Sequence, residues 1–113
     1  MIFYDSTTGK VKKLNEILVQ MVRDLEESQE RYHGYAYIRT MRNILVGKKD
    51  ACIAPYFIEK QYYGLVSKLK LEELENIMDR LVVNGVLDVI YTEHGKLFCT
   101  HEYHEEMCKK KYF

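Results

Sequence analysis

A chain of 113 residues is long enough for one small domain with one hydrophobic core. Hydrophobic residues make up 47% and charged residues 30%, a globular composition that excludes a disordered or fibrous chain. Because 17 Lys and Arg balance 17 Asp and Glu, a uniformly basic surface is also excluded, and any basic face must come from segregation of charge along the chain.

The cellular setting follows from the apolar runs and the cysteines. No apolar run approaches the about 20 residues of a membrane helix, and residues 1–10 lack the basic start and apolar stretch of a signal peptide. Cys52, Cys99 and Cys108 form no C-x-x-C pair, which indicates free thiols in a reducing compartment. We expect an intracellular protein without membrane contact, in the nucleus of a eukaryote or the cytoplasm and nucleoid of a bacterium.

The first predicted element is an amphipathic helix from Lys10 to Glu27, with Thr7 or Thr8 as its N-cap. Its apolar residues recur at spacings of three and four: Val11, Leu14, Ile17, Leu18, Met21, Val22 and Leu25. The polar stretch from Asp24 to Arg31 predicts that this helix frays into a connector before Gly34.

A second helical pattern runs from about Tyr35 to Leu45, and Gly47 suits its C-terminal cap because glycine adopts the left-handed conformation at little cost. Pro55 predicts a short helix that begins near it, and Gly64 predicts a turn. A third clear helix covers Leu71 to Val83 and ends at Asn84-Gly85.

After Gly85 the apolar residues alternate with a period of two, which is typical of β-strands. The runs Val86 to Tyr91 and Lys96 to Thr100 predict two strands around a tight turn at Glu93-His94-Gly95. Thr100 is a candidate cap for a last helix, His101 to Lys111. The predicted fold class is therefore mainly α with a small β-hairpin, a winged helix with an extra N-terminal helix. Residues 1–33 form the N-terminal helix and connector and residues 34–113 the winged helix, within one compact domain.

The segment that follows Gly34 resembles the RQC winged-helix domain of RecQ-family DNA helicases over roughly residues 34 to 100. The resemblance rests on a helix that ends in a leucine-x-glycine segment, an aromatic-glycine turn, and a helix that ends before a glycine turn and a hairpin. The matching stretches are Leu45-Val46-Gly47-Lys48, Tyr63-Gly64 and Leu81-Val82-Val83-Asn84-Gly85-Val86-Leu87. Val46 stands where such domains often carry arginine, and this sequence contains neither the zinc module nor the helicase motor of that family.

The resemblance implies a non-catalytic accessory domain of an ATP-dependent DNA helicase, with roles in DNA repair, replication and recombination. Its expected partners are duplex, forked or branched DNA and a parent helicase motor. A shorter resemblance, from Arg80 to Met107, is to the amino-terminal winged helix of the E3 ligase for the ubiquitin-like modifier UFM, which implies protein docking. A small transcription regulator and a homodimer through the Lys10–Glu27 helix are further alternatives.

The candidate DNA-binding residues divide into phosphate-binding and wing residues. Phosphate contacts are expected from basic residues and a serine near the helix ends: Arg39, Arg42, Lys48, Lys49, Ser67, Lys68 and Lys70. The glutamates at 72, 73 and 75 argue against insertion of the third helix into the major groove, because they would face phosphate oxygens. Recognition of shape and backbone is therefore expected, without readout of base sequence.

At the wing, Tyr91, His94 and Lys96 bracket the turn, and an aromatic ring there can stack on a terminal base pair. The alternative interpretation is that Tyr91 and Phe98 form a cross-strand packing pair.

No cofactor, metal or catalytic residue is expected. Cys99, His101, His104 and Cys108 are residues of ligating type, but their spacing lacks the paired pattern of a zinc site. The sequence contains neither a nucleophile and base in a recognisable pattern nor a glycine-rich phosphate loop.

Overall fold

A computed structural model describes residues 2–5, 10–32, 35–48 and 53–111. The element order is β1 (Ile2–Asp5), β2 (Lys10–Lys13), α1 (Leu14–Glu27), α2 (Gln29–Tyr32), α3 (Ile38–Val46), α4 (Pro55–Ile58), α5 (Leu71–Val83), β3 (Asp88–Thr92), β4 (Gly95–Cys99) and α6 (His101–Lys111). The predicted fold class, mainly helical with a small β-hairpin, is confirmed. Among the described residues, no helix is both long and apolar enough to cross a membrane.

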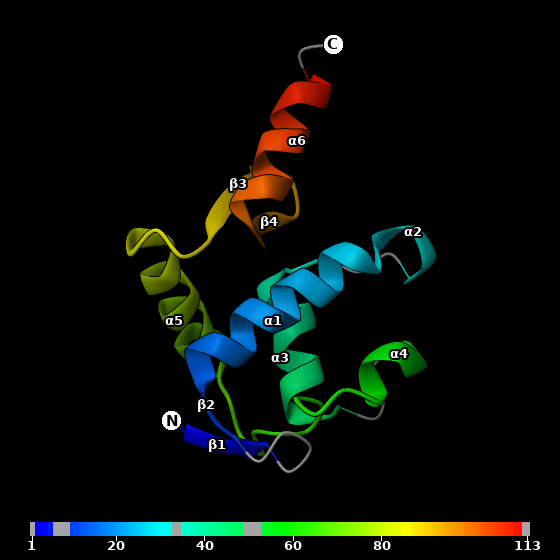
Figure 1. The fold of residues 1–113 in the computed structure, drawn as a ribbon, viewed down its shortest axis with the longest axis vertical. Helices are drawn as coiled ribbons and strands as arrows, with labels where there is room; N and C mark the ends of the chain where they lie inside the picture. Colours follow the sequence, from blue (N-terminus) through cyan, green and yellow to red (C-terminus); the bar gives the residue numbers. More distant parts are fainter. Residues whose placement is uncertain (1, 6–9, 33–34, 49–52, 112–113) are drawn as a thin grey trace.

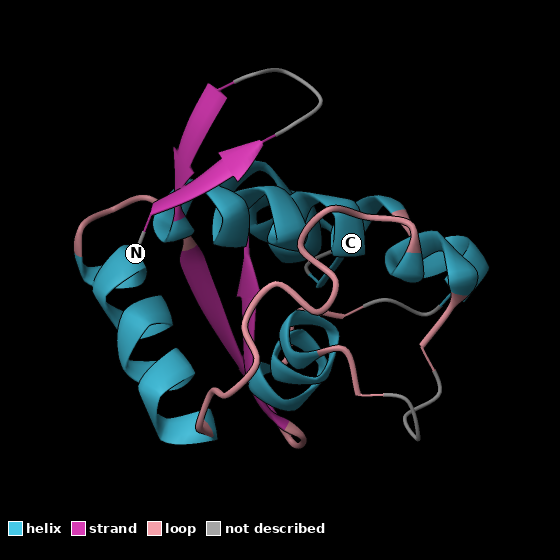
Figure 2. Cartoon of the chain, turned by 90° about the horizontal axis from the view of Figure 1, so that it is seen from below, coloured by secondary structure: helices cyan, strands magenta, loops and turns pink. Residues whose placement is uncertain are grey.

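The prediction for the N-terminal segment is partly wrong. Residues Lys10–Lys13 form β2, which pairs antiparallel with β1, and the two strands stand out from the helical body (Figure 2). The helix α1 begins only at Leu14, where the Glu16 carboxylate accepts a hydrogen bond from the Lys13 backbone N–H at 3.3 Å. The predicted caps Thr7 and Thr8 lie outside the described residues.

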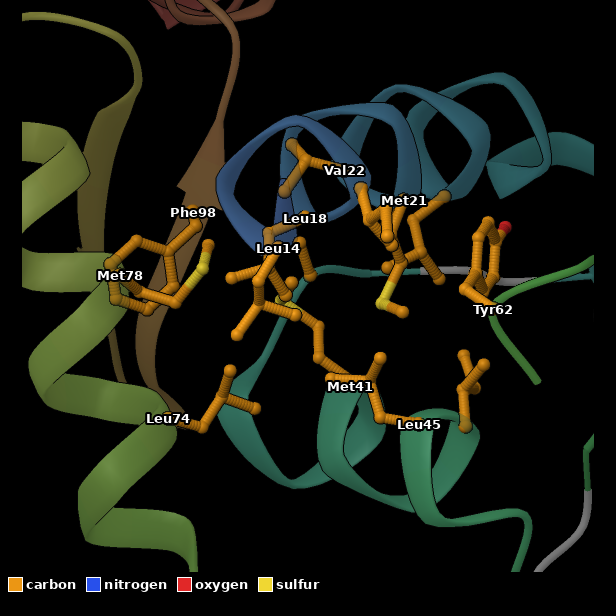
Figure 3. Close-up of a cluster of buried hydrophobic side chains, with 14 of the residues drawn as sticks. Leu14, Leu18, Met21, Val22, Met41, Leu45, Tyr62, Leu74, Met78 and Phe98 are labelled. Carbon is orange, nitrogen blue, oxygen red and sulfur yellow. The ribbon is translucent and has the colours of Figure 1, made fainter. Parts of the chain in front are cut away.

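The hydrophobic core lies where α1 crosses α3 and α5 (Figures 1 and 3). Six apolar side chains of α1 are buried there, so its apolar stripe faces the core: Leu14, Ile17, Leu18, Met21, Val22 and Leu25. The other labelled residues of the cluster in Figure 3 are Met41 and Leu45 of α3, Tyr62 between α4 and α5, Leu74 and Met78 of α5, and Phe98 of β4.

The boundaries of α5 and α6 agree with the predicted ranges, whereas α3 begins three residues later than predicted, at Ile38. Gly47 ends α3 with φ 67°, as predicted, because that left-handed conformation is strained for residues with a side chain. The Thr100 hydroxyl accepts a hydrogen bond from the Tyr103 backbone N–H at 3.3 Å, which confirms the cap of α6. Ahead of α3, Tyr37 forms an isolated antiparallel bridge with Leu97 of β4, which ties the start of α3 to the hairpin.

Candidate nucleic-acid interface

The two strands of the β3–β4 hairpin differ in burial: residues 97–99 of β4 are buried, whereas β3 is half-buried except at Tyr91. Phe98 lies opposite Val89 and is buried, whereas Tyr91 lies opposite Lys96 and is 76% exposed. The alternative interpretation of Tyr91 and Phe98 as a cross-strand pair is therefore wrong, because the register gives each a different partner. Tyr91 is left as an exposed aromatic ring on a strand whose neighbour is fixed to the core.

The turn at the tip of the hairpin is held by Thr92. Its hydroxyl accepts a hydrogen bond from the His94 backbone N–H at 3.1 Å and donates one to the Gly95 carbonyl at 2.9 Å. The same oxygen lies 3.3 Å from the Tyr37 hydroxyl, which connects the turn to the residue before α3. The exposed His94 ring stands edge-on to the Tyr37 ring at 6.4 Å between centroids. The tip is therefore ordered, with its imidazole in solvent.

A surface hollow of about 370 Å³ separates this turn from the first residues of α3 and α5. Its wall includes the rings of Tyr37 and His94, the exposed Arg39 and the side chains of Leu71 and Glu75. The hollow thus combines aromatic rings, a cation, an apolar side chain and the Glu75 carboxylate, whose charge Lys96 offsets. Its aromatic rings offer a face on which a planar base can stack.

Lys96, one of the predicted DNA-binding residues, already has anionic partners. Its ammonium nitrogen lies 3.1 Å from Glu75 Oε1 and 3.1 Å from Asp79 Oδ1, both on α5. The hydrogen bonds that its ammonium donates to these carboxylates raise the pKa of Lys96 above its ordinary value. Its charge is therefore neutralised within the domain, and it joins the wing to α5.

Arg42 also has a structural contact, which sequence reasoning did not foresee. Its Nε donates a 2.7 Å hydrogen bond to the Leu69 carbonyl, and this bond holds the segment before α5 beside α3. Ser67, Lys68 and Lys70 belong to that segment and are exposed.

The remaining predicted bases lie along α3. Arg39 is exposed near its start and Lys48 just past its end. The segment before α5 runs along α3, because the Gly64 and Val66 N–H groups bond backbone carbonyls in the last turn of α3 and Arg42 bonds the Leu69 carbonyl. Exposed bases therefore lie near the start of α3, just past its end, and on the segment beside its middle. We call these four exposed bases the basic edge: Arg39, Lys68, Lys70 and Lys48. Lys49 lies outside the described residues.

The first turn of α5 carries the opposite charge. Glu72 and Glu73 are exposed there, beside the half-buried Glu75 that binds Lys96. An acidic helix start repels phosphate, so α5 is poorly suited to enter a DNA groove.

The residues of ligating type near the C-terminus are arranged differently from a zinc site. Cys99 is fully buried, whereas Cys108 is exposed. His101 and His104 both contact Asp88, a residue that no sequence motif singles out. In the described part of the chain, no group of three or more His, Cys, Asp or Glu residues is arranged to hold a metal ion.

Comparison with known proteins does not assign the chain. No protein-family model matches it, and no curated protein does. What the chain binds must be inferred from its own residues.

Proposed function

We propose that the chain is a DNA-binding winged-helix domain of the RQC type, an accessory domain of a RecQ-type helicase that is not catalytic by itself. The observation that carries the proposal is the exposed ring of Tyr91, 76% accessible, on a hairpin whose other strand is buried through Leu97 and Phe98. A rigid hairpin with an exposed aromatic face can stack against the end of a duplex, where stacking contributes about 1 to 3 kcal/mol per base.

The basic edge supports the same proposal, because exposed lysine and arginine side chains can follow a phosphate backbone. Arg39, Lys68, Lys70 and Lys48 supply a few cations in a domain without net charge. We therefore expect weak binding that depends strongly on salt, and little dependence on sequence.

A second candidate function, docking of a protein, is favoured by a separate observation. Val83 is 84% and Val86 is 46% exposed at the end of α5, and Val86 lines a hollow of about 440 Å³ with Val19 and Leu81. An apolar margin of this kind is typical of protein contacts more than of DNA contacts.

The test is a fluorescence-anisotropy titration of the chain with a forked and a blunt duplex of equal length at two salt concentrations. Lys68→Ala with Lys70→Ala should weaken binding to both DNAs alike and flatten the salt slope, by about 0.9 per lost phosphate contact. Arg23→Ala is the matched control, since Arg23 is an exposed base on α1 beside Val19 and away from the basic edge. Absence of binding at low salt, or an equal loss with Arg23→Ala, contradicts the proposal and leaves protein docking.

The wing is tested by the ratio of affinities for forked and blunt DNA. Tyr91→Ala and His94→Ala should reduce this ratio, because only a duplex end or fork offers a base face for stacking. Lys96→Ala should leave the salt slope unchanged, since Glu75 and Asp79 already neutralise that charge. If folded Tyr91 and His94 variants keep the parental ratio, the hairpin has a structural role only.

A further inference from the structure

Two histidines of α6 converge on one carboxylate oxygen. Oδ2 of Asp88, the first residue of β3, lies 2.9 Å from His101 Nδ1 and 3.1 Å from His104 Nδ1. His101 and His104 are three residues apart and therefore share the side of α6 that faces the hairpin. This contact joins the last helix, which projects from the hairpin in Figure 1, to the strand that also carries Tyr91.

The ring of His101 has a second contact, and its chemistry decides the protonation state. Nε2 of His101 lies 2.7 Å from the Gly85 carbonyl oxygen. A carbonyl oxygen and a carboxylate oxygen can only accept hydrogen bonds, so the ring must donate from both nitrogens. A neutral imidazole carries one N–H and would place a lone pair against one of the two oxygens. Only the imidazolium satisfies both partners.

We infer that His101 is a proton-operated latch between the start of α6 and the hairpin: its imidazolium holds both Asp88 and the Gly85 carbonyl, and loss of the proton breaks one of these two bonds and loosens α6. The latch is open to solvent, because the side chains of His101 and Asp88 are 52% and 30% exposed. Release is local, since two other contacts hold α6 to the N-terminal helices. The Glu26 carboxylate accepts a 2.7 Å hydrogen bond from the Thr100 N–H, and Gln29 accepts one from the Tyr103 hydroxyl at 3.2 Å.

The neighbouring charges act in both directions. Asp88 favours the imidazolium, and Glu102 in the first turn of α6 adds to this. The positive end of the α6 dipole opposes a cation at His101 but favours the Asp88 carboxylate. Besides Asp88, His101 and His104, the hollow beside the latch is lined by Glu105, Cys108 and Lys109, one acid and one base whose charges offset each other.

The pH window follows from these contacts. The hydrogen bond to Asp88 raises the pKa of His101, and the hydrogen bond from His101 lowers the pKa of Asp88. A raised histidine pKa contributes stability that is complete below the ordinary histidine pKa, and this contribution is lost as the pH rises through the pKa of the folded state. The lowered carboxyl pKa adds stability that is lost only in strong acid. The latch is therefore closed in mildly acidic solution and opens on the alkaline side.

The experiment is an NMR titration of the full chain from about pH 5 to pH 9, the range that brackets the ordinary histidine pKa. It follows the ring signals of His101 and the backbone order of residues 105–109. His101 should titrate above the range of an unstructured histidine, and the order of α6 should fall over the same pH interval. Asp88→Asn should abolish both effects. His101→Arg, a permanent cation, should keep α6 ordered across the range. His94→Gln is the control, because His94 lies at the other end of the hairpin.

The Phe98 amide signal reports on folding in each variant, and His101→Arg gives an answer even if Asp88→Asn fails to fold. The inference is overturned if the order of α6 does not follow the titration of His101, or if Asp88→Asn leaves both unchanged. It is also overturned if one equivalent of zinc at pH 8 shifts both histidine rings and orders α6, since the cluster would then be a metal site. None of these outcomes depends on DNA binding.

Discussion

The Tyr62 hydroxyl donates a 2.8 Å hydrogen bond to Oδ2 of Asp24, and both side chains are buried. Gln20 donates to the other carboxylate oxygen of Asp24 at 3.0 Å. The bond joins the segment before Gly64 to α1, two parts of the chain with no backbone pairing between them. A buried carboxylate is stable only with such partners, so this contact fixes how the long α3–α5 connection lies on the core.

Tyr62→Phe should lower the free energy of unfolding by about 1 to 3 kcal/mol, because it leaves one oxygen of a buried carboxylate without a partner. Urea unfolding at pH 7 measures this, with Tyr63→Phe at the adjacent half-buried tyrosine as the control. Burial and Asp24 also raise the pKa of Tyr62, so its contribution to stability is present below the ordinary tyrosine pKa and is lost as the pH rises beyond it. Equal stability of the two variants would contradict this role.

Glu26→Ala should destabilise the protein by about 1 to 3 kcal/mol, since the Thr100 N–H then loses its acceptor at the start of α6. Glu26→Gln should cost much less, because the amide oxygen can accept the same bond. Burial raises the pKa of Glu26, so the ionised form is disfavoured in the folded state and this penalty disappears below the ordinary glutamate pKa. Guanidinium unfolding of both variants at pH 4 and pH 7 tests whether the Gln variant is the more stable of the two. A Gln variant as unstable as the Ala variant would contradict the prediction.

Gly47→Ala should destabilise more than Gly85→Ala. Both glycines have positive φ, 67° and 76°, so both replacements cost about 1 to 2 kcal/mol of backbone strain. A Cβ at Gly47 would also lie 3.0 Å from the Gly64 Cα, whereas a Cβ at Gly85 meets nothing within 4 Å. Thermal unfolding of the two variants separates the clash from the strain, and equal melting temperatures would show that the clash is relieved by a small shift.

Alkylation with iodoacetamide at pH 8 should modify Cys108 and spare Cys99 in the folded protein. Cys108 is exposed, whereas burial of Cys99 raises its pKa to about 12 and leaves little reactive thiolate. Peptide mass spectrometry gives the extent at each site, and the reaction in urea shows that both thiols are competent. Rapid modification of Cys99 without denaturant would mean that the hairpin opens from the core.

The sequence alone predicts those helices that have one continuous apolar stripe and clear residues that end it. The range Leu71–Val83 was predicted to the residue, because an apolar stripe ends at Asn84-Gly85. The N-terminal hairpin could not be predicted in the same way. Val11 has the spacing of the apolar residues of α1, so the sequence pattern places it in the helix, although it belongs to β2. Asp24 was assigned to a polar connector because its burial depends on Tyr62, which is distant in the sequence.

In the candidate site too, features set by neighbouring residues were predictable from the sequence, whereas contacts between distant residues were not. The exposure of Tyr91 and His94 at the wing follows from the turn and the strand period, which are visible in the sequence. The engagement of Lys96 with Glu75 and Asp79 depends on how the hairpin lies against α5, and no short-range pattern encodes it. The same holds for Asp88, whose two histidine partners follow the other strand of the hairpin.

The close approach of Gly47 and Gly64 implies a pattern of evolutionary constraint. The Gly64 N–H bonds the Ile44 carbonyl at 2.9 Å, and the Val66 N–H bonds the Leu45 carbonyl at 3.0 Å, so the chain crosses the end of α3 backbone against backbone. A side chain at Gly47 would lie 3.0 Å from the Gly64 Cα and push this crossing apart, which would move Lys48 relative to Lys68. At Gly64 the constraint is the backbone, because its φ of 68° is strained for residues with a side chain. Descendants of this sequence that keep the crossing should retain both glycines together, while the stretch between them drifts in length and composition. The paired glycines would then mark distant relatives better than any charged residue of the surface.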